Sequence, residues 1–188
     1  MDFLDAYINE TTQLISALDR PAITAALDAI KAAYDAGQRV FICGNGGSAA
    51  TASHMVNDLV KMPTVIGRTS VRAMSLSDNV PLLMAVANDI DYADVFVTPL
   101  KAFFEPGDVV IGISASGNSE NVLRAIRYAN DNGGVTVGLC GFKGGTLREI
   151  AQVPVYSPVE HYGKVEDAHC VACHCLAYWF VETLRREG

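Results

Sequence analysis

The sequence lacks the features that mark membrane, secreted and nucleic-acid-binding proteins. None of its apolar runs approaches the ~20 residues that a membrane-spanning helix needs. Lysine and arginine number 14 against 21 acidic residues and form no cluster, so the net charge of −7 argues against a non-specific grip on nucleic acid. Asp2, Asp5 and Glu10 interrupt any signal-peptide core. We therefore expect a cytoplasmic protein with no membrane or nucleic-acid partner.

Linkers, repeats and a disulfide framework are also missing, since the five cysteines are odd in number and crowd toward one end. From residue 40 onward, short apolar runs alternate with helix-like segments, which is typical of a parallel sheet covered on both faces. The pattern predicts strands over 40–43, 71–76, 109–113, 135–140 and 153–156, and helices over 49–61, 80–87, 93–104, 119–130 and 165–186.

Two more helices are predicted ahead of the sheet. Apolar residues repeat at helical spacing over residues 3–18, and Pro21 suits the first position of a second helix that ends near Gly37. We therefore expect a single α/β domain over 1–188, with a core over 37–188 and a helical extension over 1–36.

The last predicted helix is apolar on nearly every side between Val165 and Val181. Such a helix is buried on more than one face, and in a chain of this size a second subunit most simply covers the extra face. We therefore expect a homo-oligomer, to which the N-terminal helices contribute contacts.

Two polar turns follow predicted strands, at the edge where a parallel sheet binds ligands. The first is Gly44-Asn-Gly-Gly-Ser48, and the second is Ser114-Ala-Ser-Gly-Asn-Ser119. Hydroxyl and backbone N–H groups at a helix N-terminus suit a compact dianion such as a phosphate monoester. Serine is also a common helix cap and turn former, so a structural role is the alternative for each turn. Two such turns in one small sheet favour a ligand.

The first turn also fits the dinucleotide pattern G-x-G-x-x-A from Gly44 to Ala49. The acidic residue that should follow about 20 positions later is missing, because Asp78 comes late, and no P-loop lysine is present. We therefore expect no nucleotide, with an NAD-dependent enzyme as the alternative.

Three segments, CGNGGSAATASH, AVANDIDYADVF and GISASGNSENVLRAI, resemble the sugar isomerase (SIS) family. The similarity covers nearly the whole chain and is closest to the phosphoheptose isomerase branch, which includes a non-catalytic relative that assists replication initiation. It implies a flavodoxin-like three-layer αβα sandwich with a five-stranded parallel sheet, in a tetramer with active sites at subunit boundaries. It also implies that a phosphorylated sugar is bound by Asn45, Gly46, Gly47, Ser48, Asn88, Asp89, Ser114, Ala115, Ser116, Ser119 and Glu166.

Four residues on two predicted helices are candidates for chemistry. An aldose–ketose isomerase needs a base near carbon and a second group that serves the oxygens. His54 and Asp58 lie four residues apart on one helix face, and Glu166 and His174 lie just over two turns apart. The related isomerases have His, Glu, Gln and His at these places, where the residues bind a divalent metal, usually zinc. The resemblance therefore implies a metal site of all four residues, with Asp58 and His174 catalytic.

The chain departs from the family pattern at several of these positions. Asp58 is one methylene shorter than Glu, and Glu166 adds a negative charge, which would tighten a metal site or raise the pKa of a neighbouring carboxylate. Ala115 replaces a common hydroxyl residue, and the segment before Glu166 is about three residues shorter by alignment. A helix-surface ion pair and a core histidine are the structural alternatives for the four candidates.

Cys170-Val-Ala-Cys-His174 matches the haem attachment pattern C-x-x-C-H, but it lies in a strongly apolar helix. We therefore expect no haem, and we interpret the cysteines as small core residues. A zinc cluster of His169, Cys170, Cys173 and Cys175 on one rigid helix is likewise not expected.

The resemblance, together with these residues, implies an isomerase that converts sedoheptulose 7-phosphate to D-glycero-D-manno-heptose 7-phosphate through an enediol. The alternative is a non-catalytic SIS protein that binds a sugar phosphate or a protein partner. The presence of His174 argues against it, because a retired site would be expected to lose its base.

Overall fold

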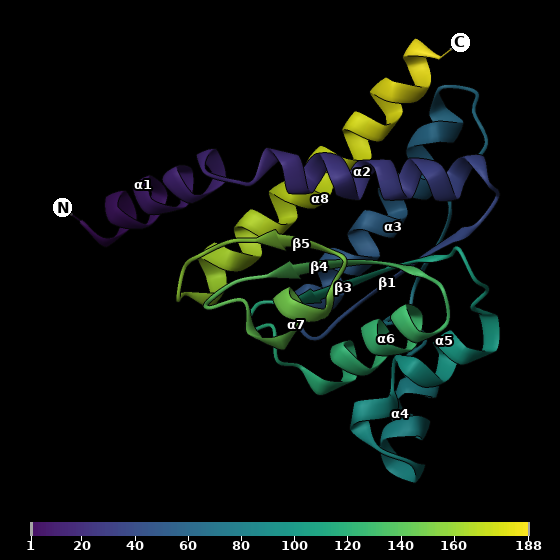
Figure 1. Cartoon of the computed structure of the whole chain (residues 1–188). Helices are drawn as coiled ribbons and strands as arrows, with labels where there is room; N and C mark the ends of the chain where they lie inside the picture. Colours follow the sequence, from purple (N-terminus) through teal and green to yellow (C-terminus); the bar gives the residue numbers. More distant parts are fainter. Residues whose placement is uncertain (1, 188) are drawn as a thin grey trace.

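The computed structural model describes residues 2–187, so residues 1 and 188 of the predicted domain lie outside the described part. Five parallel strands form one sheet in the order β2-β1-β3-β4-β5 (Figure 1). Almost every residue of β1, β3 and β4 is buried, which explains their continuous apolar sequences. The predicted parallel sheet is confirmed, with strands β1 Arg39–Gly44, β2 Arg72–Ser75, β3 Val109–Ser114, β4 Val135–Cys140 and β5 Val153–Tyr156.

Helices cover both faces of the sheet, and the sheet divides the hydrophobic core into two clusters (Figure 1). One face is covered by α2 Arg20–Asp35, α3 Gly47–Val65 and α8 Tyr162–Arg186. The other is covered by α4 Val80–Asp89, α5 Val97–Phe103, α6 Glu120–Asp131 and α7 Gly145–Ile150. This is the expected three-layer αβα sandwich. Within residues 2–187, no helix has the length and apolar character to cross a lipid bilayer.

The first helix, α1 Phe3–Ser16, projects beside the start of α8 (Figure 1). Two polar contacts hold it there: the Tyr7 hydroxyl donates to Asp167 Oδ2 at 2.7 Å, and Lys164 Nζ donates to Glu10 Oε2 at 2.5 Å. The Asp167 contact raises the pKa of Tyr7, and Lys164 lowers the pKa of Glu10. Three apolar side chains of α1 remain largely exposed, Phe3 at 75%, Leu4 at 60% and Ile8 at 53%.

Helix α3 continues past the predicted end at residue 61, although Pro63 lies inside it. A proline cannot donate to the carbonyl four residues earlier. That carbonyl, on Leu59, instead accepts from Val71 N at 3.3 Å, so it is not left unpaired. A contact with the chain leading into β2 therefore lets the helix tolerate its proline.

Several other helices differ from the prediction. The helix expected over 93–104 is broken into a 3₁₀ turn, Tyr92–Asp94, and α5. Helix α7 was not predicted. Helix α8 begins three residues early, because the His161 side chain accepts from Lys164 N at 3.4 Å and caps it.

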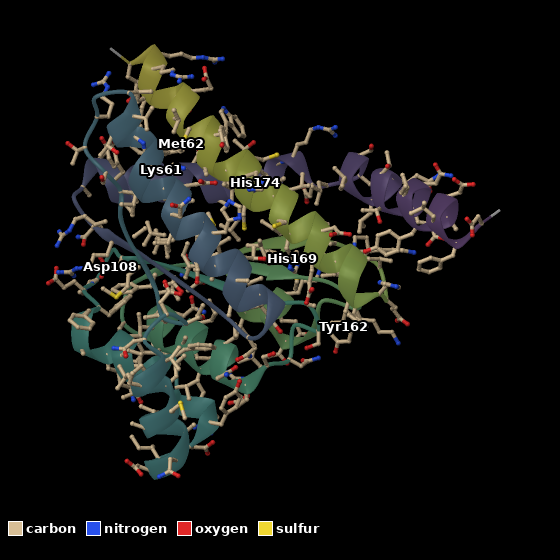
Figure 2. The ribbon with its side chains drawn as sticks, turned by 180° about the vertical axis from the view of Figure 1, so that it is seen from behind. Lys61, Met62, Asp108, Tyr162, His169 and His174 are labelled. Atoms are coloured by element: carbon tan, nitrogen blue, oxygen red, sulfur yellow. The ribbon has the colours of Figure 1, made fainter. Side chains whose placement is uncertain are left out.

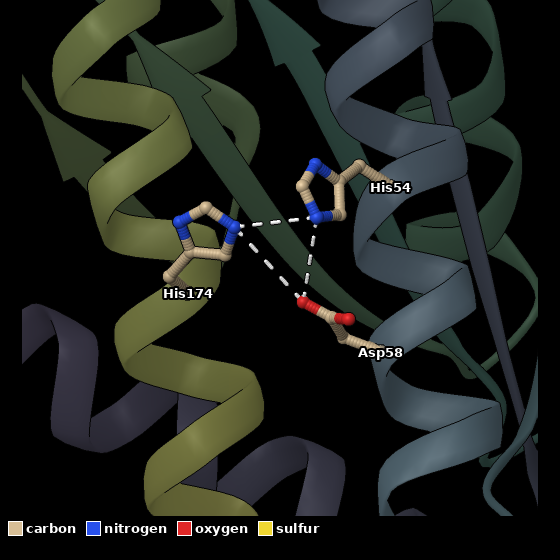
Figure 3. Close-up of side chains that lie close together, drawn as sticks. All are labelled: His54, Asp58 and His174. Atoms are coloured by element: carbon tan, nitrogen blue, oxygen red, sulfur yellow. Dashed lines mark hydrogen bonds and ion pairs between the residues drawn. The ribbon is translucent and has the colours of Figure 1, made fainter.

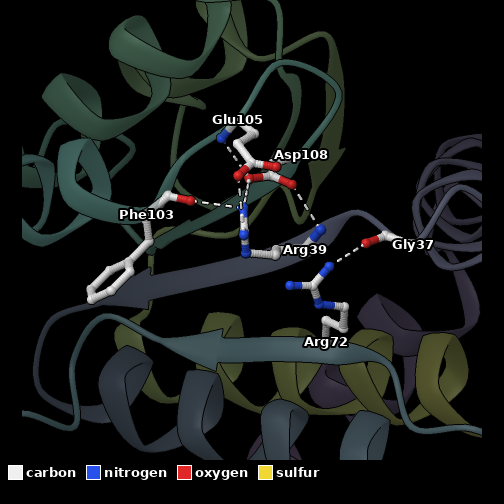
Figure 4. A network of polar contacts seen from close by, with 6 residues as sticks. All are labelled: Gly37, Arg39, Arg72, Phe103, Glu105 and Asp108. Carbon is white, nitrogen blue, oxygen red and sulfur yellow. Dashed lines mark hydrogen bonds and ion pairs between the residues drawn. The ribbon is translucent and has the colours of Figure 1, made fainter.

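Charged contacts fix the sheet where its strands begin, at the amino ends of β1, β2 and β3 (Figure 4). Asp108, fully buried, accepts from the backbone N–H of Arg39 and of Glu105, both at 2.8 Å. The Arg39 guanidinium lies 3.5 Å from Asp108 and 3.2 Å from Glu105. Arg72, at the start of β2, donates to the Gly37 carbonyl at 2.7 Å. These contacts hold the starts of β1, β2 and β3 in place, and so set where their other ends lie.

Candidate functional site

The loops that follow β1 and β3 lie side by side, because these strands are neighbours in the sheet. Together with the first turns of α8 they enclose a cavity of about 140 Å³. Its lining residues are Asn45, Ser48, Ile113, Ser114, Ala115, Ser116, Ser119, Tyr162 and Glu166. The structure thus brings the two predicted turns together at one cavity.

The wall of this cavity formed by the β3 loop presents hydroxyl groups at the N-terminus of α6. Ser119 precedes the helix but makes no side-chain capping bond, and its Oγ lies 3.0 Å from Ser114 Oγ. Ser116 Oγ accepts from the backbone N–H of Asn118 at 3.2 Å. The described lining contains no lysine or arginine. An anion held here would therefore depend on hydroxyl donors, backbone N–H groups and the helix dipole.

Glu166 adds a carboxylate to the same cavity and lies against the first loop. A Cβ placed on Gly47 would lie 2.8 Å from Glu166 Oε2, so a larger residue here would require the Glu166 carboxylate to shift. The Gly46–Gly47 turn therefore brings the backbone of the loop next to α8.

The loop after β4, residues 141–145, packs against the loop after β3, residues 114–119, which is called the serine loop. A Cβ on Gly117 would lie 1.8 Å from the Gly144 carbonyl oxygen, and a Cβ on Gly145 would lie 2.6 Å from the Gly117 carbonyl carbon. Both glycines have positive φ, +68° for Gly117 and +56° for Gly145. The Leu147 N–H donates to the Gly117 carbonyl at 2.9 Å. The two loops thus touch backbone to backbone, which keeps the serine loop in place.

His54, Asp58 and His174 come together where α3 packs against α8 (Figure 3). The two histidine Nε2 atoms are 3.4 Å apart, and Asp58 Oδ2 lies 3.7 Å from His54 Nε2 and 4.0 Å from His174 Nε2. The Asp58 side chain is only 5% exposed, whereas both imidazoles reach solvent. Figure 2 shows His174 on the face that α8 presents beside α3.

This group could hold a divalent metal ion. Two imidazoles and a carboxylate are a common donor set for zinc, and other divalent ions also accept it. Tetrahedral bonds of about 2.0 Å place ligand atoms about 3.3 Å apart, close to the His54–His174 separation. Three protein donors leave a coordination position open, which is typical of catalytic rather than structural sites.

Three predicted residues lie apart from this group. Glu166 is eight residues before His174 on α8, about 12 Å along the helix, and lines the serine cavity instead. Asn88 and Asp89 lie at the end of α4, where Asn88 Nδ2 donates to Asp89 Oδ1 at 2.6 Å. Both are exposed, and neither lines the serine cavity of the described chain.

Cys43, Cys140, Cys173 and His169 are buried, unlike the two histidines of the His54 group. Cys170 is only half-buried and Cys175 is exposed, so the expectation that the cysteines of the last helix are core residues is wrong for these two. Burial raises the pKa of Cys43 and of Cys140 to about 12, and it also raises the pKa of Cys173. His169 is 1% exposed, its ring nitrogens have no hydrogen-bond partner in the described structure, and burial lowers its pKa to about 4. The backbone of Cys140 lies near the ring and opposes this shift, but the effect of burial is larger. His169 is therefore a neutral core residue at physiological pH.

Sequence reasoning missed three residues at this edge of the sheet. Tyr162 lines the serine cavity. Asn121 and Tyr92 both bond to Asn45. Tyr92 and Asn121 lie within two of the segments that resemble the SIS family, but nothing in those segments marks these two residues, since each reaches the site only through the packing of separate elements.

Comparison with known proteins gives a consistent result. The SIS domain family model matches residues 6–141. A phosphoheptose isomerase of Geotalea daltonii is 38% identical over 159 residues, which cover 83% of this chain and 81% of the relative. A phosphoheptose isomerase of Mycobacterium tuberculosis is 41% identical over 150 residues, which cover 80% and 76%.

Two solved structures share the fold. The phosphoheptose isomerase of Francisella tularensis matches with a TM-score of 0.90 and 26% identity, covering 97% of this chain and 100% of that one. The enzyme of Neisseria gonorrhoeae matches with a TM-score of 0.87 and 24% identity, covering 94% and 96%. At the latter identity the likeness shows the fold alone.

Proposed function

The chain belongs to the SIS domain family, and on that premise we propose that it is a phosphosugar aldose–ketose isomerase. Its substrate is sedoheptulose 7-phosphate and its product D-glycero-D-manno-heptose 7-phosphate. The observation that carries the proposal is that the same two helices, α3 and α8, border the serine cavity at their N-terminal ends and carry the His54–Asp58–His174 group farther along.

The serine cavity binds the phosphate group of the substrate. Ser48, Ser114, Ser116 and Ser119 donate hydrogen bonds, and the N-terminus of α6 adds its dipole. Gly46 and Gly47 let the loop backbone come close, and the Ala115 methyl leaves room between two serines. Glu166, being anionic, faces the sugar hydroxyls rather than the phosphate, because like charges repel.

The sugar extends from this cavity along the α3–α8 boundary. His54 lies six positions after Ser48 in α3, about 9 Å along the helix, which is on the scale of an extended sugar phosphate. The reacting carbons then lie beside Asp58 and His174 while the phosphate remains at the serines. This spacing favours a long-chain sugar phosphate.

Asp58 and His174 carry out the proton transfers. One takes the proton from the carbon next to the carbonyl, which gives an enediol, and returns a proton to the neighbouring carbon. The other moves a proton between the two oxygens, so no atom or electron is gained or lost overall. Zinc, held by His54, Asp58 and His174, would polarise the sugar oxygens.

The working unit is a cytoplasmic homotetramer of single-domain subunits with active sites at the subunit boundaries. Residues 1–36 pack between subunits, consistent with the exposed apolar side chains of α1. Asn88 and Asp89, which lie outside the cavity of one chain, complete the site of a neighbouring subunit.

Proton exchange tests the activity directly. The protein is incubated in D₂O with C5–C7 ketose and aldose phosphates, and deuterium entry at C1 or C2 is followed by NMR. We expect exchange with the C7 substrate and none with His174→Ala, which should still bind the sugar phosphate.

A matched control is His161→Asn, which removes an exposed imidazole but leaves a residue that can cap α8. It should exchange at the wild-type rate. Binding of the C7 sugar phosphate without exchange would favour the non-catalytic alternative, and full exchange by His174→Ala would exclude the assigned chemistry.

A further inference from the structure

Asn45 is held by two side chains from other elements. Its Oδ1 accepts from Asn121 Nδ2 at 2.9 Å and from the Tyr92 hydroxyl at 2.8 Å. Its Nδ2 donates to Asn121 Oδ1 at 2.9 Å. The two carboxamides therefore exchange hydrogen bonds in both directions, with the tyrosine adding a third bond.

These bonds use most of the hydrogen-bonding capacity of the Asn45 side chain. A carboxamide has two acceptor positions and two N–H donors, and three of the four are used here. Asn121 is 2% exposed, so its half of the pair is shielded from water. Asn45 is thus held in place as a structural link, and one N–H remains for the ligand role expected from sequence, since Asn45 also lines the serine cavity.

The link joins the two loops that form the serine cavity. Asn45 precedes Gly46, Gly47 and Ser48 in the loop after β1, and Asn121 lies in the first turn of α6, two residues after Ser119. Tyr92 reaches the pair from the 3₁₀ turn after α4. At the start of the same loop, the Gly44 carbonyl accepts from the hydroxyl of Ser77, which lies just after β2, at 3.0 Å. The first loop is therefore fixed at its start and again at Asn45.

We infer that Asn121 and Tyr92 are positioning residues of the phosphate site, which act through Asn45 to hold the Gly46–Ser48 turn against the serine loop. The inference rests on the proposed function only in taking a phosphate group as the ligand. Misplaced donors weaken an anion site even when all donors remain present. Loss of the link should therefore weaken phosphate binding and leave the distant His54–Asp58–His174 group unchanged.

The experiment measures inorganic phosphate binding by calorimetry, together with KM, kcat and thermal stability. Asn121→Ala removes both amide bonds and should weaken phosphate binding about 10- to 100-fold, whereas Tyr92→Phe removes one bond and should weaken it about 3- to 10-fold. KM should rise in proportion, with kcat within about 2-fold of wild type. Tyr128→Phe, on the same helix as Asn121, is the matched control and should change nothing.

A double-mutant cycle separates positioning from a general loss of structure. If the amides act as a pair, Asn45→Ala combined with Asn121→Ala should bind phosphate no more weakly than the weaker single variant. Additive losses, or a fall in kcat with unchanged phosphate affinity, would overturn the inference. If Asn121→Ala does not fold, Tyr92→Phe decides, since its ring is 60% exposed and its loss of one hydroxyl leaves the core intact.

The same measurements distinguish this inference from the proposed activity. Wild-type protein that binds phosphate without catalysing exchange would contradict the isomerase assignment and still allow the positioning effect to be measured. Wild-type protein that binds no inorganic phosphate at millimolar concentration would overturn the positioning inference, and proton exchange would still decide the activity.

Discussion

His54 and His174 lie on different helices, yet their Nε2 atoms are only 3.4 Å apart, with the rings nearly perpendicular at 77°. Two ring nitrogens at this distance cannot both carry a hydrogen directed at the other. One ring can donate to the other, or both lone pairs can converge on a cation beside the Asp58 carboxylate. The pair could therefore serve as part of a metal ligand set.

Zinc should raise the thermal midpoint of the protein, because an ion that binds the folded chain stabilises it by mass action. His174→Ala should abolish most of this shift, and His161→Asn should keep it. The shift should shrink as the solution is acidified, since protons compete with metal for the imidazoles. Differential scanning fluorimetry with Zn²⁺, Mn²⁺ and Mg²⁺ checks this, and an equal zinc shift in His174→Ala would contradict the assigned site.

Ser116→Ala should weaken substrate binding more than turnover. The hydroxyl lines the phosphate cavity, and a hydrogen bond to a charged group contributes enough that its loss should raise KM by about 10-fold. Ser16→Ala is a suitable control, because that hydroxyl is exposed and bonds only to the Thr12 carbonyl at 2.8 Å of its own helix. Steady-state kinetics decide: an unchanged KM with full kcat would argue against the phosphate cavity.

Stability should fall in mild acid because of His169. Burial lowers its pKa from 6.5 to about 4, so between these values the unfolded chain binds a proton that the folded chain does not. The neutral His169 makes its full contribution to the free energy of unfolding above pH 6.5. This contribution falls by up to about 1.4 kcal/mol for each pH unit and is lost as the pH falls through about 4.

Urea denaturation at several pH values measures this effect. His169→Leu should reduce the dependence of the unfolding free energy on pH by about one proton. His161→Asn should retain it, because that histidine is exposed. Identical slopes in wild type and His169→Leu would show that another group causes the acid sensitivity.

The exposed apolar face of α1 should be an interface between subunits. Ile8→Glu places a charge on this face and should shift the particle to a smaller mass, whereas Gln13→Glu adds the same charge at another exposed position of α1 and should not. Analytical ultracentrifugation of wild type should give a tetramer. A wild-type monomer at micromolar concentration would remove the quaternary proposal.

The sheet could be predicted closely because its central strands are buried on both faces, which leaves a continuous apolar run in the sequence. Helix ends were less predictable because they depend on partners far along the chain. Pro63 signals a helix end, but the Leu59 carbonyl finds its donor in Val71. Helix α7 has only six residues and begins at Gly145, directly after Gly144, and both glycines have positive φ, so its sequence resembles a turn.

The candidate site was predictable in its parts and less so in their arrangement. Strand order places the serine turns at one edge, and the i, i+4 spacing predicts that His54 and Asp58 share a face. The rotation of α8 relative to α3 depends on packing, so the sequence could not show that His174 meets this pair while Glu166 faces Gly47.

The contact between Gly117 and Gly145 has an evolutionary consequence. Neither residue has a side chain to offer a ligand, yet a methyl group on either would collide with the backbone of the other loop. A lineage could exchange residues around the sugar and acquire a new substrate, but it could not replace one of these glycines without reshaping both loops. Among descendants of this chain, the two positions should vary together or remain fixed, whatever the enzyme comes to act on.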